Sequence, residues 1–151
     1  MDENALIMEH RIFGIKENAE YLDREGAYFI PICNEKIGIV ETSKGYFLLG
    51  GGIEKGESHS ECIERECIEE AGYTPLIIGK VCSAESYLTH SMFGYFHPIQ
   101  TYYFGEFAQK VSEPIEKDHK LHWISYEDLK GKMFAEMQNY ALDELMRIIN
   151  K

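Results

Sequence analysis

Apolar and polar residues along the chain form a series of short strand-like runs, separated and followed by helix-like stretches. Runs rich in β-branched and aromatic side chains predict strands. Asn34 and Glu35 stand between the first two runs and predict a hairpin turn. The aromatic-rich residues 89–98 are expected to form a loop. The predicted strands are residues 27–32, 36–40, 46–49, 76–88, 99–107 and 121–124.

Two stretches predict helices. The first runs from about residue 57 to 71, and Gly72 stands where a glycine commonly follows a helix end. Ser125 and Asp128 have the spacing of a capped helix start ahead of the second. The apolar residues of the second stretch recur at helical spacing and should face the core. They are Met133, Met137, Tyr140, Ala141, Leu145, Met146 and Ile149.

The order of these elements predicts an α/β or α+β fold, with helices packed on a mixed β-sheet. The 151 residues suit one domain, 1–151, because no repeat or linker divides them. Residues 1–24 are a candidate extension, in which Leu6 to Gly14 would add a strand or hairpin. No stretch has the roughly 20 apolar residues that span a bilayer, and the amino terminus lacks the pattern of a signal peptide. We therefore expect a soluble, cytoplasmic protein.

Charge and cysteine content argue against some classes of partner and against a zinc site. The formal net charge is −11, which argues against a long nucleic acid and against an anionic membrane surface as partners. The four cysteines form no C-x-x-C pair and no zinc-like spacing with histidine, so free thiols in a reducing compartment are expected.

The segment from Gly50 to Tyr73 carries the candidate chemistry. A glycine-rich turn leads into a helix on which Glu66, Glu69 and Glu70 share one face, because they are three and four residues apart. Like charges so close together destabilise a helix unless a cation compensates them, and carboxylate oxygens are the ligands that Mg²⁺ prefers. A solvated acidic helix is the alternative. The face with Ile63, Cys67 and Ala71 should pack on the sheet, with Glu61, Glu64 and Arg65 pointing away from it.

The spacing of this segment decides between the two interpretations. Gly51 is followed after five residues by Glu57, and after seven more by Arg65-Glu66-Cys67-Ile68-Glu69-Glu70-Ala71-Gly72-Tyr73. This pattern resembles the complete box of the Nudix hydrolase family. It departs from the usual pattern at three packing positions, Leu49, Cys67 and Tyr73. The resemblance implies an α/β/α sandwich with a mixed sheet.

The resemblance also implies an activity, the hydrolysis of a nucleoside diphosphate linked to another moiety, such as a modified nucleoside triphosphate, with Mg²⁺ or Mn²⁺. Glu66, Glu69, Glu70 and the Gly50 carbonyl would be metal ligands. Glu57 would support the site through water or a hydrogen bond. Arg65 would orient a carboxylate with its planar guanidinium, its alternative being an ordinary surface ion pair.

Outside the box, the sequence indicates functional residues less directly. Some family members carry the general base on a loop ahead of the last strand, where Glu116 is the first candidate and Asp118 the second. A solvated acidic loop is the alternative for both.

Substrate recognition is assigned to aromatic residues and two histidines downstream of the box. The candidates for stacking on a base are Tyr87, Phe93, Tyr95, Phe96, Tyr102 and Tyr103, and those for contacting phosphate are His90 and His97. Most strand aromatics are core residues, which is the alternative for each.

Three other functions remain open. A nucleotide-sensing module would use the fold without turnover, but such a module should lose carboxylates that this chain keeps. A dinucleoside polyphosphate hydrolase is suggested only by the position of Tyr87. An acidic helix that binds Ca²⁺ incidentally lacks an EF-hand pattern. The expected partner is a small nucleotide, and a homodimer is compatible with the sequence.

Overall fold

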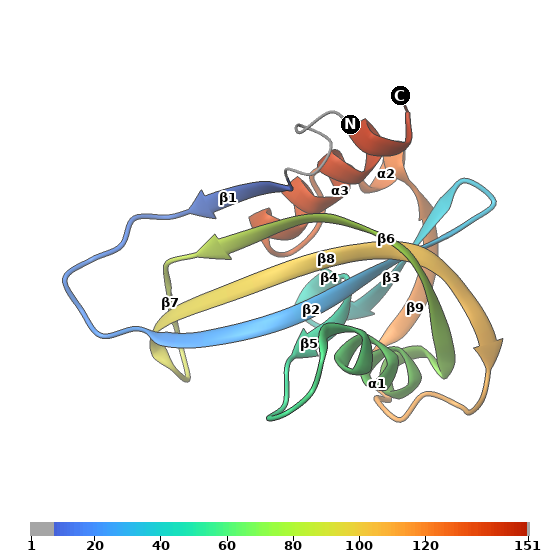
Figure 1. The fold of residues 1–151 in the computed structure, drawn as a ribbon, viewed down its shortest axis with the longest axis horizontal. Helices are drawn as coiled ribbons and strands as arrows, with labels where there is room; N and C mark the ends of the chain where they lie inside the picture. The colour runs from blue at the N-terminus through green and yellow to red at the C-terminus, as the bar shows by residue number, and fades with distance from the viewer. Residues whose placement is uncertain (1–7, 151) are drawn as a thin grey trace.

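The computed structural model describes residues 8–150 and consists of a mixed β-sheet with helices packed on both faces (Figure 1). The sandwich with a mixed sheet is therefore confirmed. The strands are β1 (Glu9–Phe13), β2 (Leu22–Cys33), β3 (Lys36–Thr42), β4 (Gly45–Phe47), β5 (Leu49–Gly52), β6 (Tyr73–Ser86), β7 (Leu88–His90), β8 (Gly94–Lys110) and β9 (Lys120–Ser125). The helices are α1 (His59–Ala71), α2 (Tyr126–Leu129) and α3 (Glu136–Ile149).

The sheet combines parallel and antiparallel pairs along its main path, β1-β6-β8-β2-β3-β4. The β1–β6 and β2–β8 pairs are parallel, and β8 pairs antiparallel with β6. Three strands lie off this path: β5 pairs with β2, β7 with β8 and β9 with β3. The glycine-rich strand β5 is thereby held on β2, with Gly50 opposite Tyr28.

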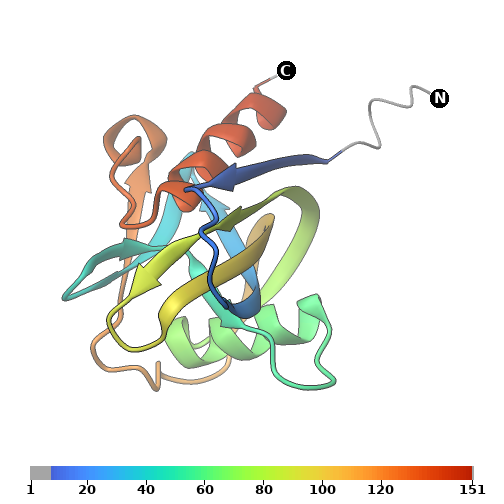
Figure 2. The ribbon, with the colours of Figure 1, turned by 90° about the vertical axis from the view of Figure 1, so that its left-hand side faces the viewer.

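The long strand β2 serves two cores because its side chains alternate between the faces of the sheet. Ala27 and Phe29 pack with α1, whereas Tyr28 and Ile30 belong to the cluster that α3 covers. Figure 2 shows α1 and α3 on opposite sides of the strands. The stripe predicted for the last helix faces the second core through Met137, Ala141 and Leu145. Ile149 at the end of the stripe is 41% exposed, and Leu142, which was not predicted, is buried.

Helix α1 begins at a side-chain capping box and ends at a glycine. The Ser58 hydroxyl accepts from the Glu61 N–H, and the Glu61 carboxylate accepts from the Ser58 N–H. This capping box starts the helix at His59, so Glu57 lies before the helix rather than within its first turn. Gly72 ends the helix with φ 78°, a left-handed conformation that favours glycine, which confirms the predicted end.

Several boundaries differ from the sequence-based expectation. Strand β2 begins at Leu22 rather than at residue 27, and the run 46–49 is divided between β4 and β5. The aromatic stretch 89–98 is a hairpin of β7 and β8 rather than a loop, because its side chains alternate along strands paired with each other and with β2. Ser125 caps only the single turn α2. Gly131, with φ 73°, separates that turn from α3, so Met133 is buried but precedes the helix.

The amino-terminal segment adds strand β1, which lies parallel to β6 from Glu9↔Cys82 to Phe13↔Ser86. The part of the predicted extension at Leu6 and Ile7 lies outside the described residues. All four cysteines are free thiols, and Cys33 alone among them is exposed. Within residues 8–150, no helix is both long and apolar enough to cross a membrane.

Candidate active site

The glycine turn of β5 fits against α1 so closely that side chains are excluded. The Gly50 N–H donates to Glu70 Oε1 at 2.8 Å. Gly50 has φ 137°, and a Cβ at this residue would overlap the Ala27 carbonyl oxygen. A Cβ at Gly51 would overlap the carboxylate of Glu66. The glycines therefore let the backbone of β5 touch the acidic face of the helix.

Arg65 is the centre of a carboxylate network. Its Nε and Nη2 donate to the two oxygens of Glu57 at 2.8 and 3.1 Å, a two-pronged contact. Its Nη1 lies 2.6 Å from Glu66 Oε1 and 3.5 Å from Glu69 Oε2. Nη2 also donates to the Gly52 carbonyl at 3.1 Å. The expectation that Arg65 points away from the packed part of the protein is wrong, because this guanidinium turns back onto the glycine turn.

The carboxylates of the site differ strongly in their electrostatics. Hydrogen bonds from Arg65 lower the pKa of Glu57 to about 2, so this carboxylate is ionised throughout the physiological range. Burial raises the pKa of Glu70 to about 8, although the Gly50 N–H partly offsets this effect. Burial also raises the pKa of Glu66, against the opposing charge of Arg65. Negative charge in this cluster is therefore only partly compensated by the protein.

This arrangement fits a hard divalent cation. Glu70 is only 5 % exposed, and within the described part of the chain no lysine or arginine forms an ion pair with it. Glu66 and Glu69 share the Nη1 of Arg65, which brings these carboxylates together on the same face of α1. Buried carboxylates are stable when paired with a cation, and oxygen ligands of this kind suit Mg²⁺ or Mn²⁺.

The loop between β8 and β9 runs past the carboxyl end of α1 (Figure 1). The N–H groups of Ile115 and Glu116 donate to the Glu69 carbonyl at 2.8 and 3.1 Å. Glu116, Asp118 and His119 place ligand atoms within 4.8 Å of one another. The structure thus brings both candidates for the general base to the edge of the acidic cluster.

His119 is a site residue that sequence reasoning did not single out. Its Nδ1 lies 3.0 Å from Glu70 Oε2, so both oxygens of Glu70 have a partner in the protein. Its position one residue after Asp118 was the only signal in the sequence. Arg24 was also missed: its guanidinium occupies the space where a Cβ of Gly52 would lie.

A cavity of about 500 Å³ opens beside Glu70, between the sheet, the amino end of α3 and the β8–β9 loop. Its walls are largely apolar and aromatic. They include Tyr28, Phe47, Phe96, Pro98, Phe134 and Met137, with the polar residues Gln100 and Gln138. A smaller cavity of about 140 Å³ shares Tyr28, Phe96, Pro98 and Gln100 with it and continues to Arg24, Gly51 and Gly52.

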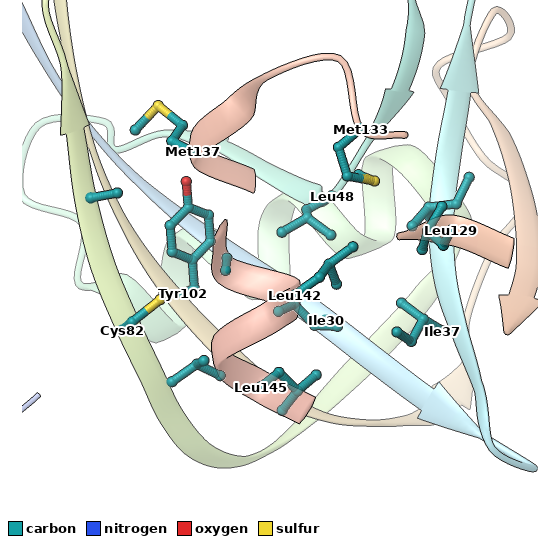
Figure 3. Packing of buried hydrophobic residues seen from close by; sticks show 14 residues of the cluster. Ile30, Ile37, Leu48, Cys82, Tyr102, Leu129, Met133, Met137, Leu142 and Leu145 are labelled. Atoms are coloured by element: carbon teal, nitrogen blue, oxygen red, sulfur yellow. The ribbon is translucent and has the colours of Figure 1, made fainter. Parts of the chain in front are cut away.

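Of the substrate residues expected from the sequence, His90 and Phe96 line the larger cavity, and the others lie elsewhere. Tyr102 is a core residue with no exposed surface, packed near Met137 and Leu142 (Figure 3). His97 is buried between Asp23 and Glu85, with a ring nitrogen 2.8 Å from each carboxylate. Two others are aromatic neighbours on the same side: Tyr87 stacks on His97 at 4.3 Å, and Tyr95 packs edge-on against Tyr21. None of these four lines the two cavities beside the acidic cluster.

Residues 23–145 match the family model of the NUDIX domain. The chain belongs to the NUDIX domain family. This membership supports a hydrolase, and Nudix hydrolases act on small nucleotide-like substrates. No curated protein matches the chain at a significant level.

Solved structures share the Nudix fold at low sequence identity. The MutT NUDIX hydrolase from Burkholderia pseudomallei is 18% identical with a TM-score of 0.69, and the alignment covers 82% of this chain and 98% of that one. The MutT protein from Methanosarcina mazei Go1 is 19% identical with a TM-score of 0.71, covering 89% and 100%. The E. coli ORF135 protein is 20% identical with a TM-score of 0.66, covering 85% and 92%.

Proposed function

We propose that this protein is a pyrophosphohydrolase that uses Mg²⁺ or Mn²⁺ to cleave a nucleoside diphosphate linked to another moiety, such as a modified nucleoside triphosphate. The observation that carries the proposal is the position of Glu70. This buried carboxylate belongs to the acidic cluster on α1 and also lines the 500 Å³ cavity. A diphosphate at the cluster would therefore leave its nucleoside facing the cavity.

The metal would be held by Glu66, Glu69 and Glu70, with the Gly50 carbonyl as a further ligand. When bound, a divalent cation neutralises diphosphate charge and lowers the pKa of water. The Gly50 N–H orients Glu70 from one side through its 2.8 Å hydrogen bond. Arg65 orients Glu66 and ties Glu57 to the same cluster. Fixed carboxylates of this kind lose little entropy when they bind an ion.

Two further roles follow from the neighbours of the cluster. Arg24, beside Gly52 and the smaller cavity, is placed to contact a substrate phosphate. Glu116 on the β8–β9 loop would accept the proton from the attacking water, and Asp118 is the second candidate. The nucleoside would lie among Phe47, Phe134 and Phe96, of which the sequence indicated only Phe96, rather than against the tyrosines. Phe134 is 60% exposed and its ring centroid lies 5.1 Å from that of Phe47, so it presents a free face for stacking.

The partner is proposed to be a small nucleotide. The net charge of −11 offers no basic track for a long nucleic acid, and the cavity near Glu70 has the size of a small-molecule site.

The test is a screen of nucleoside triphosphates, dinucleoside polyphosphates and nucleotide sugars, with release of phosphate or pyrophosphate as the readout. Turnover should require Mg²⁺ or Mn²⁺ and stop with a chelator. Glu64→Gln is the matched control, since this exposed glutamate of α1 lies outside the cluster, and it should keep the wild-type rate. If the protein binds one of these compounds but hydrolyses none, it would instead be a nucleotide-sensing module. If it neither binds nor hydrolyses any of them, the proposed substrate class is refuted.

A further inference from the structure

We infer that Gln100 reads the nucleobase, by presenting only hydrogen-bond donors to a keto oxygen of the base. This inference rests on the proposed function and names the substrate class more closely. It predicts that bases with a keto group at purine position 6 or pyrimidine position 4, namely guanine, hypoxanthine and uracil, are preferred to adenine and cytosine, which carry an amino group there.

The orientation of the Gln100 amide follows from a chain of hydrogen bonds that starts at the backbone. The Leu48 N–H can only donate, so the Gln138 atom at 2.9 Å is Oε1. The other atom of that amide, Nε2, can then only donate, and it lies 3.5 Å from the side chain of Gln100. The Gln100 atom that faces it must therefore be the acceptor, Oε1.

A second hydrogen bond supports this orientation. The Tyr102 hydroxyl donates to the same Gln100 Oε1 at 2.6 Å. Gln138 is 2% exposed and Tyr102 is fully buried, so both partners are held rigidly by the core. Rotating the Gln100 amide by 180° would set its NH₂ group against the NH₂ group of Gln138, which costs the hydrogen bond and creates a repulsive pair.

The NH₂ group of Gln100 is left free to bind a ligand. Among residues 8–150, no group accepts a hydrogen bond from Gln100 Nε2. No buried side-chain nitrogen or oxygen in these residues lacks a partner, so this unpaired atom must be accessible. Gln100 lines both the 500 Å³ cavity beside Glu70 and the smaller cavity beside Arg24. Its two N–H groups are therefore reached through the space proposed for the nucleoside.

A donor-only group distinguishes bases by the atom at one edge of the ring. The 6-keto oxygen of guanine or hypoxanthine and the 4-keto oxygen of uracil accept a hydrogen bond, whereas the 6-amino group of adenine and the 4-amino group of cytosine donate one. An amino base would place its own donor against the NH₂ group of Gln100. The base would also displace the water that hydrates this NH₂ group and leave the group without an acceptor. Discrimination of this kind is larger than that from apolar contacts, because a polar group is left unpaired.

The first experiment compares matched substrates on the wild-type protein with Mg²⁺. Deoxyinosine and deoxyadenosine triphosphates differ at position 6, and deoxyuridine and deoxycytidine triphosphates at position 4, in each case as keto against amino. We expect kcat/KM to favour the keto member of each pair by about 10-fold. Equal values, or a preference for the amino members, would overturn the inference.

The second experiment changes the donor to an acceptor. Gln100→Glu keeps an oxygen for Tyr102 and Gln138 but turns the free NH₂ group into a second oxygen. The keto-to-amino ratio of kcat/KM should fall by at least about 10-fold, whatever the added charge does to all nucleotides alike. Gln109→Glu on the exposed end of β8 adds the same charge away from both cavities, and its ratio should equal that of the wild type. A Gln100→Glu variant that stays folded and loses activity equally on both members would indicate a structural role only.

Binding measurements separate this inference from the proposed hydrolysis. Calorimetry with deoxyinosine and deoxyadenosine monophosphates tests recognition of the base without turnover, and also serves if Gln100→Glu does not fold. Tighter binding of the inosine compound without any triphosphate hydrolysis would support the role of Gln100 and refute the activity. Hydrolysis without discrimination between the two bases would refute the role of Gln100 alone.

Discussion

Replacing Glu70 by glutamine should abolish turnover and at the same time change how stability depends on pH. The variant keeps the size of the side chain and an oxygen for the Gly50 N–H, but it removes the buried negative charge. Burial raises the pKa of Glu70 to about 8 from a usual value of 4.5. Between these two values the folded protein holds a proton that the unfolded chain releases. Metal-free wild-type protein must therefore lose stability as pH rises from about 4.5 to about 8.

The size of the effect follows from the same two pKa values. Each unit corresponds to about 1.36 kcal/mol, so the full difference sets an upper limit of roughly 5 kcal/mol. For a chain of 151 residues, 1 kcal/mol corresponds to about 2–4 °C in Tm. Glu70→Gln cannot titrate at this position, so its Tm should fall less steeply over this range. At pH 8.5 the Tm of the variant should be higher than that of the wild type by on the order of 10 °C. At pH 5, where the wild-type carboxyl is neutral, the two proteins should have similar Tm values.

The assay is a series of thermal unfolding curves from pH 5 to 9 with a chelator, repeated with millimolar Mn²⁺. Manganese should raise the Tm of the wild type at high pH and raise that of Glu70→Gln much less. Initial rates with Mg²⁺ are measured on the same preparations. Identical pH profiles for the two proteins would show that Glu70 carries no uncompensated charge. Near-normal turnover by the folded variant would refute its role as a metal ligand.

Four further results are expected. Divalent ions should raise the wild-type Tm as RT ln(1 + [L]/Kd), with Mn²⁺ acting at lower concentration than Ca²⁺, and no shift at millimolar levels would favour a solvated acidic helix. Glu116→Gln should lower kcat by roughly 10²–10⁴ with little change in KM, while Asp118→Asn stays near wild type, and the reverse pattern would exchange their roles. Arg65→Lys should cost about 10–100-fold in activity or metal affinity, because a single ammonium cannot hold both oxygens of Glu57. Ser58→Ala should destabilise the fold by about 1 kcal/mol in denaturant unfolding without changing metal affinity, and an unchanged midpoint would contradict the capping assignment.

Local signals were sufficient for the box and for the carboxyl end of its helix, whereas the helix starts at His59 rather than at about residue 57. The spacing from Gly51 to Tyr73 identified the family, because the whole motif lies within one continuous stretch of the chain. Gly72 ends α1 as expected, since a left-handed helix end depends on the backbone of one residue. The hairpin at Asn34 and Glu35 also formed, with φ values of 51° and 65°. Strand periodicity identified most of the sheet, although it missed that the aromatic stretch 89–98 continues as β7 and β8.

The surroundings of the box depended on contacts between distant parts of the chain. Alternation along β8 places Gln100 on the cavity side, but only packing buries Tyr102 on the same face beneath α3. His97 looked like an exposed phosphate ligand, yet Asp23 and Glu85, 74 and 12 residues away, enclose it. The direction of Arg65 was decided by Gly52 and Glu57, which lie outside the helix and so outside its periodicity.

The sequence by itself therefore determined which carboxylates share a helix face, because a regular helix fixes their relative positions within a few residues. Only the tertiary structure decided which groups contact those carboxylates. Burial of Glu70 depends on the turn at Gly50 and on His119, which are 20 and 49 residues away along the chain. The cavity beside it is formed by residues from Tyr28 to Gln138. The pKa of a side chain and the shape of a pocket depend on such distant neighbours, and these come together only when the sheet and both helix layers pack.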